Sequence, residues 1–134
     1  MFDGVVYAVS VSLGFALWEN IGYVLSYGMG AAIGRALTAV PGHACFGVFM
    51  GAWYGSAKRR ELEGDTVRAA RCRRMAVLVP ALLHGCYDFI AVRQTEELSW
   101  VFFVFVLGMF FVASRVVRHL SRCDRYLNPR WDLF

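Results

Sequence analysis

The chain has 134 residues, of which 58% are hydrophobic and 18% are charged, and its net charge is +4. Soluble domains are usually closer to half apolar, so this composition indicates a protein embedded in lipid and argues against a water-soluble domain. The basic residues lie between apolar runs, which explains the positive charge by membrane topology and not by nucleic-acid binding. Asp3 stands where a signal peptide would need a cationic region, so we do not expect a cleaved leader.

Four apolar runs are long enough to cross a bilayer, because a membrane-spanning helix needs roughly 20 mainly apolar residues. They cover about residues 5–27, 36–56, 75–92 and 98–117. No linker-like segment divides them. We therefore predict an all-α fold, an integral membrane bundle of four transmembrane helices that forms one polytopic domain over residues 1–134.

The basic residues are distributed unequally between the connections. The connection between the second and third runs, and the segment after the fourth, hold twelve: Lys58, Arg59, Arg60, Arg68, Arg71, Arg73, Arg74, Arg115, Arg118, Arg122, Arg125 and Arg130. The other two connections hold one arginine each, Arg35 and Arg93. Because basic connections stay in the cytoplasm, we predict that both termini are cytoplasmic (N-in/C-in).

Three of the apolar runs carry polar residues that are costly in lipid and suggest function by default. The first contains Glu19 and Asn20, the second His43, and the third both His84 and Asp88. At ~1.5 Å of rise per residue, Glu19, His43 and Asp88 fall at ~20 Å from the cytoplasmic side, and His84 falls one turn lower. We therefore expect these groups to meet in the outer half of the membrane.

Two imidazoles and a carboxylate are a common ligand set of catalytic zinc, with a fourth position left for water. His84 and Asp88 are four residues apart and share a helix face. Asp88 then either fixes the tautomer of a metal-bound His84 or binds the metal itself. Two alternatives need no proteolysis: a network of satisfied buried hydrogen bonds, or a haem- or metal-binding bundle, in which His43 and His84 would be the axial ligands of a haem.

The second run also contains glycines four residues apart, at positions 47, 51 and 55. Small residues at this spacing let helix backbones approach closely in lipid. We interpret the pattern as a helix-packing surface.

Three segments resemble the motifs of the PrsW-type intramembrane proteases, in the same order. Residues 14–23, in which Phe15 precedes Glu19 by four positions, resemble the FxxxE motif. Residues 35–47 resemble the second motif, which carries His43, and residues 83–89 resemble the third, which carries His84 and Asp88.

The resemblance implies a membrane-embedded, metal-dependent endopeptidase, distantly similar to the CAAX-prenyl protease and bacteriocin-immunity group. It implies site-1 cleavage of a single-span membrane protein, such as an anti-sigma factor, in the cell membrane of a prokaryote. Carried over, Glu19, His43 and His84 are metal-binding or catalytic, and Asp88 and Asn20 support them. The expected cofactor is a divalent metal, with zinc as the first candidate.

The chain departs from the family pattern at its start. The family begins with an EExxK motif ahead of the FxxxE span, whereas this chain has only Met1-Phe2-Asp3-Gly4 there. We expect an N-terminally truncated protease core. The alternatives are a catalytically inactive pseudoprotease, or an enzyme in which Glu19 is the base and the histidines hold the metal.

Overall fold

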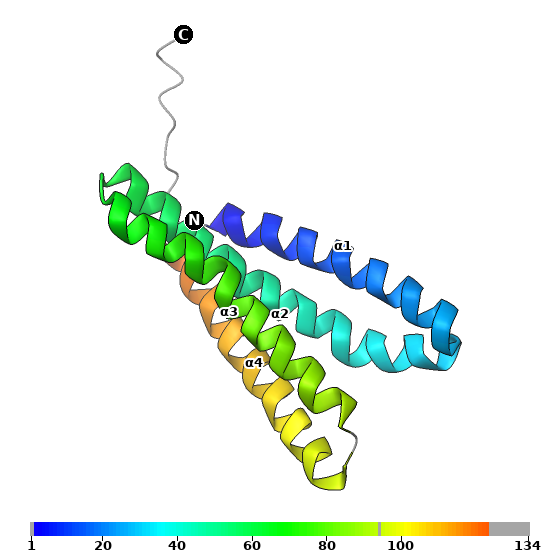
Figure 1. Ribbon diagram of the computed structural model, residues 1–134. Coiled ribbons are helices and arrows are strands. Elements are labelled where there is room, and N and C mark those ends of the chain that lie inside the picture. Colours follow the sequence, from blue (N-terminus) through cyan, green and yellow to red (C-terminus); the bar gives the residue numbers. More distant parts are fainter. Residues whose placement is uncertain (1, 94, 124–134) are drawn as a thin grey trace.

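The structure is a computed structural model that describes residues 2–93 and 95–123. Four helices follow one another along the chain: α1 (Phe2–Tyr27), α2 (Met29–Leu62), α3 (Thr66–Val92) and α4 (Glu96–Cys123) (Figure 1). Each is long and apolar enough to cross a membrane, and each contains one of the four predicted apolar runs. The predicted all-α, four-span fold is therefore confirmed.

The helices are longer than the apolar runs, most of all at the junction of α2 and α3. Only residues 63–65 separate the two helices, and Gly64 turns the chain with a φ of 82° that glycine adopts without strain. The Asp65 carboxylate caps α3 by accepting a hydrogen bond from the backbone N–H of Arg68 at 3.0 Å. The basic residues predicted to lie in a loop therefore lie mainly on helix ends.

The same correction applies to the opposite end of the molecule. Gly28, with a φ of 81°, is the single residue between α1 and α2. Arg35, predicted to lie in the connection, is instead in the second turn of α2. Hydropathy marks the part of a helix that lies in lipid, whereas the helix continues for as long as its backbone hydrogen bonds are made.

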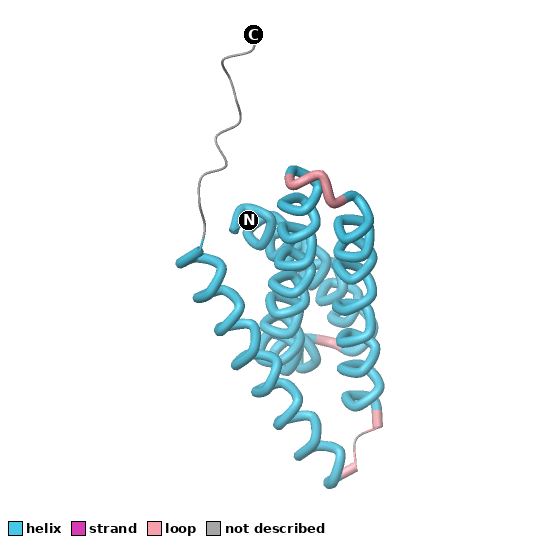
Figure 2. The backbone as a smooth tube through the Cα atoms, turned by 90° about the vertical axis from the view of Figure 1, so that its left-hand side faces the viewer, coloured by secondary structure: helices cyan, strands magenta, loops and turns pink. Residues whose placement is uncertain are grey.

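Consecutive helices run antiparallel, so that α1–α2 and α3–α4 form two hairpins, and α2 packs against each of the other helices. The α1–α2 hairpin is closely packed, whereas α4 leans away from α3 with distance from their connection (Figure 2). The hairpins are closest where the α2–α3 turn lies, and they diverge toward the α1–α2 turn and the start of α4 (Figures 1 and 2). The packed core centres on α2, α3 and α4 and includes Phe46, Tyr87 and Met109.

The α1–α2 hairpin packs through glycine. A Cβ added to Gly47 would lie 2.6 Å from the Val9 Cα, and one added to Gly51 would overlap the backbone at Val5. These contacts agree with the packing surface predicted from the glycine spacing. They hold α1 directly against α2, and so bring Glu19 near the histidine on α2.

Candidate metal centre

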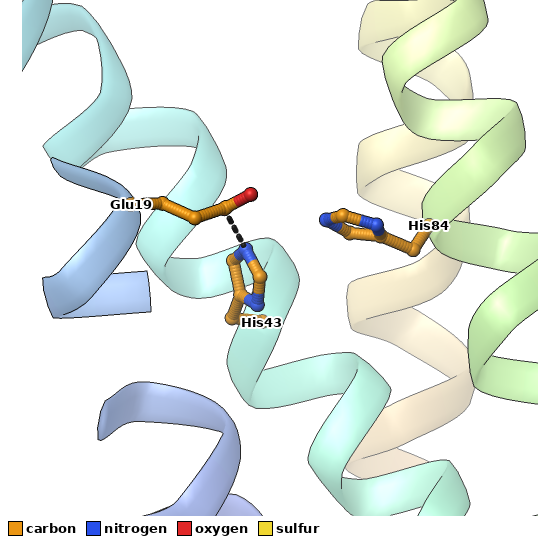
Figure 3. A group of neighbouring side chains, drawn as sticks. All are labelled: Glu19, His43 and His84. Carbon is orange, nitrogen blue, oxygen red and sulfur yellow. Dashed lines mark hydrogen bonds and ion pairs between the residues drawn. The ribbon is translucent and has the colours of Figure 1, made fainter. Parts of the chain in front are cut away.

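Glu19 from α1, His43 from α2 and His84 from α3 meet between the helices (Figure 3). Each residue offers one ligand atom, and these three atoms all lie within 4.8 Å of one another. The structure therefore brings together, at one point, three residues that are far apart in the sequence.

His43 is the most enclosed member of the group. It is 4% exposed, and among the residues that the structure describes it is the one buried polar residue. Its ring packs against Phe46 and Phe15, with ring centroids 5.6 Å and 5.8 Å away, and against His84 at 5.0 Å. Its backbone carbonyl accepts a hydrogen bond of 2.6 Å from the Ser12 hydroxyl on α1. His43 is thus held by packing and by a polar link to the neighbouring helix.

The Glu19 carboxylate points at the His43 ring. Its Oε2 lies 2.9 Å from the Nε2 of His43 and accepts a hydrogen bond of 3.0 Å from the Nη2 of Arg35. The side chain of Glu19 is 23% exposed. One oxygen of the carboxylate is therefore committed to two neighbours, both of which belong to α2.

His84 extends from α3 toward the other two residues (Figure 3). Its Nδ1 lies 3.5 Å from the Oδ2 of Asp88, one turn further along α3, which is longer than an ordinary hydrogen bond. The Asp88 side chain is 52% exposed, and Asp88 is not among the ligand atoms of the group. Of the two roles predicted for Asp88, the geometry favours orienting His84 over binding a metal.

Arg35 belongs to this site, although the sequence analysis assigned it to a connection. Its Nε donates a hydrogen bond of 2.9 Å to the Oδ1 of Asn20, and its guanidinium lies over the Tyr23 ring, 3.8 Å from the centroid. Its side chain is 17% exposed. The sequence did hold one signal for a role of Arg35 in the site. Arg35 begins the segment that carries His43, and it lies at the end of the molecule that has few other basic residues.

A pocket of about 840 Å³ opens beside the site, at the end where the hairpins diverge. All four helices line it. Arg35 and Asp88 connect it to the group formed by Glu19, His43 and His84, and Tyr23, Thr38, Tyr87 and Phe102 supply part of its remaining wall. The pocket offers a mainly apolar and aromatic surface with a few polar groups, next to the site.

The donor set fits a divalent transition metal. Ligand atoms around tetrahedral zinc lie ~2 Å from the ion, and hence roughly 3.3 Å from one another, so small side-chain rotations would bring the three atoms into range. A haem fits poorly, because its plane would have to separate His43 from His84. Those rings pack directly together and against Phe46, with centroids 5.0 to 5.6 Å apart.

Comparison with known proteins gives a consistent result. Residues 1–116 match the family described as PrsW family intramembrane metalloprotease. The chain is 40% identical over 130 residues to Protease PrsW of Geobacillus kaustophilus, covering 96% of this chain and 53% of that protein. It is 36% identical over 124 residues to Protease PrsW of Halalkalibacterium halodurans, covering 92% and 55%.

A third relative, Protease PrsW of Bacillus subtilis, is 40% identical over 109 residues, covering 81% of this chain and 47% of that protein. The chain thus spans about half the length of the curated relatives it matches. No solved structure matches it.

Proposed function

The chain belongs to the PrsW family of intramembrane metalloproteases, and from this premise we propose that it forms the metal-binding core of a protease that cleaves a membrane-anchored protein. Glu19, His43 and His84 hold a divalent metal, with zinc as the first candidate. Asp88 orients His84, and Asn20 supports the site through Arg35.

One observation carries the proposal. Three different helices deliver a carboxylate and two imidazoles to within 4.8 Å of one another, inside helices apolar enough to span a membrane. Ionisable groups are costly in that environment, and helix packing alone does not require two histidines and an acid at one point.

A divalent metal bound here would supply Lewis-acid chemistry, lowering the pKa of a bound water and polarising a peptide carbonyl. The chain's own residues prepare the site for it. The Phe15 and Phe46 rings pack against His43 and restrict water around the imidazole. Ser12 and Arg35 tie α1 to α2, so that Glu19 and His43 keep their relative positions.

The pocket beside the site gives a substrate segment room to reach it. Its volume of about 840 Å³ lies within the range of ligand-binding pockets. Because the site lies between membrane-spanning helices, the substrate we propose is a protein with a single membrane span, of which an anti-sigma factor is one example. The protein is a prokaryotic integral membrane protein, and the proposed location is the cell membrane.

The test combines metal content with cleavage. We expect the purified protein to bind one zinc per chain. We also expect cells that express the protein from its natural reading frame to cleave a co-expressed single-span substrate. His43→Ala and His84→Ala should lose both properties. His119→Ala is the matched control, since His119 lies on an exposed part of α4 near Cys123 and should behave as wild type.

The outcomes separate the alternatives. Unchanged cleavage in His43→Ala would refute the proposed centre. Stoichiometric zinc without cleavage of any substrate would favour a pseudoprotease, and a Soret absorption band would favour haem.

A further inference from the structure

Arg35 is a permanently charged side chain inside a segment that can span a membrane. Only 17% of its side chain is exposed. Removing a guanidinium from water is costly unless its donors are satisfied. The partners of the Arg35 guanidinium offset this cost, and their arrangement indicates what Arg35 does in the site.

Two of the three partners of Arg35 are neighbours in the sequence. Its Nε donates to the Asn20 Oδ1 at 2.9 Å, and its Nη2 donates to the Glu19 Oε2 at 3.0 Å. The guanidinium plane is rigid and presents its donors in a fixed fork. A fork that engages two adjacent side chains on α1 fixes both the position and the rotation of the Glu19 carboxylate.

The third partner holds the fork itself in place. The Tyr23 ring, one helical turn after Glu19 on α1, lies under the guanidinium with its centroid 3.8 Å from the Cζ. A planar guanidinium stacks well on an aromatic ring, whereas a lysine ammonium cannot reproduce this contact together with a two-pronged hydrogen bond.

We infer that Arg35 is a positioning residue, which holds the Glu19 carboxylate in the orientation that a metal ion requires at His43 and His84. Asn20 is the second anchor of the same clamp. The inference rests on the proposed metal centre and deepens it, because it makes metal affinity depend on a residue that is not itself a ligand. Arg35 acts through Glu19 and not by contact with the metal.

Charge and geometry must be separated in the test, because a cation close to a metal ion also repels it. Arg35→Lys keeps the charge and removes the fork. Asn20→Ala leaves every charge unchanged and removes only the anchor. A clamp predicts that both variants bind metal more weakly, whereas simple charge repulsion predicts no change in either.

The experiment measures Co²⁺ binding to the purified protein in detergent, by the visible absorption of the bound ion. Loss of a hydrogen-bond partner that orients a ligand typically costs roughly 10- to 100-fold in metal affinity. We expect about a tenfold loss in Arg35→Lys, a similar loss in Asn20→Ala, and little further loss when the two are combined. The absorption bands should also change in position and intensity, because Glu19 is free to rotate.

Arg93→Lys is the matched control. Arg93 lies near the same end of the molecule, and its guanidinium lies 4.8 Å from the Phe89 ring, but its side chain is exposed. It should keep wild-type affinity and absorption.

Wild-type Co²⁺ affinity in Arg35→Lys would overturn the inference, as would a lower melting temperature with affinity and absorption unchanged. Absence of Co²⁺ binding in the wild type would overturn the metal centre and this inference together. A wild type that binds Co²⁺ and shows the Arg35 effect, yet cleaves no substrate, would refute proteolysis while leaving the clamp intact.

Discussion

Glu19 is the residue on which the polar contacts of the site converge. Its Oε2 is shared between the His43 ring and the Arg35 guanidinium, and the neighbouring Asn20 engages the same arginine. Two roles are compatible with Glu19 in the sequence, a metal ligand or a base with the histidines as ligands. Its position within the ligand group favours the first.

Replacing Glu19 with glutamine separates these roles, since the change keeps the size and one carbonyl oxygen but removes the charge. We expect Glu19→Gln to weaken metal binding by more than the roughly 10- to 100-fold lost with a supporting partner. Isothermal titration with Zn²⁺ measures this effect. Glu63→Gln, in an exposed pair with Arg59, should leave the affinity unchanged. Full metal occupancy combined with lost cleavage in Glu19→Gln would instead identify a base.

The meeting of these residues could be predicted from the sequence only in part. Counting residues along each span gives the depth of a residue in the membrane, and the count placed Glu19, His43 and Asp88 at the same depth. It does not give the rotation of a helix. His84 follows the buried Pro80 by four positions and precedes the buried Tyr87 by three, which turns it toward the core. That face of α3 brings His84 to the site and leaves Asp88 more exposed.

At the scale of elements, the α1–α2 pair decides whether the site forms. The glycine spacing predicted close packing, but spacing alone cannot say which helix is the partner. The structure identifies α1, because a Cβ on Gly4 would lie 3.3 Å from the Gly51 carbonyl oxygen, so that small residues face each other across the pair. Glu19 and Ser12 reach α2 because of that approach.

Gly51→Ala tests this packing. The added methyl group meets the α1 backbone at Gly4 and Val5, which cannot rotate away as a side chain could. We expect a loss of about 1–3 kcal/mol of stability, the usual cost of overpacking, measured by unfolding in mixed detergent micelles. Because α1 is displaced, zinc affinity should fall as well.

The control for this variant is Gly85→Ala. Gly85 lies inside α3, two turns before its end, and a Cβ there meets nothing within 4 Å. Alanine is the better helix former, so stability should stay the same or rise. Equal stability of Gly51→Ala and wild type would show that α1 packs elsewhere.

At the scale of the whole molecule, hydropathy was enough to predict four spans, whereas the divergence of the hairpins was not predictable. Between helices in lipid there is no hydrophobic driving force, so packing detail sets their angles. Here α2 packs against every other helix, while the backbones of α1 and α3 stay apart in the described part of the chain and the two helices approach through side chains such as Glu19 and His84. The divergence opens the pocket beside the site, and its lining could not be foreseen from the sequence.

The position of that pocket gives the proposed orientation a functional consequence. Ten basic residues of the described chain lie near the α2–α3 turn or toward the end of α4, which share one end of the molecule with the start of α1 (Figure 1). With Arg35 turned inward onto Glu19, Arg93 is the one basic side chain exposed at the other end among the described residues. The bias in basic residues predicted from the sequence is thus kept between the two ends of the described chain, and basic ends stay in the cytoplasm.

We expect alkaline phosphatase fused after Arg93 to be active, and green fluorescent protein fused after Gly64 or Cys123 to fluoresce. The reverse pattern would refute the N-in/C-in orientation. The pocket is lined by Tyr27, Val92 and Leu98, which lie near the α1–α2 turn and the α3–α4 connection, so this orientation places its mouth toward the outer face of the membrane. Under the proposed function, a membrane-anchored substrate would then be cleaved on its extracytoplasmic side.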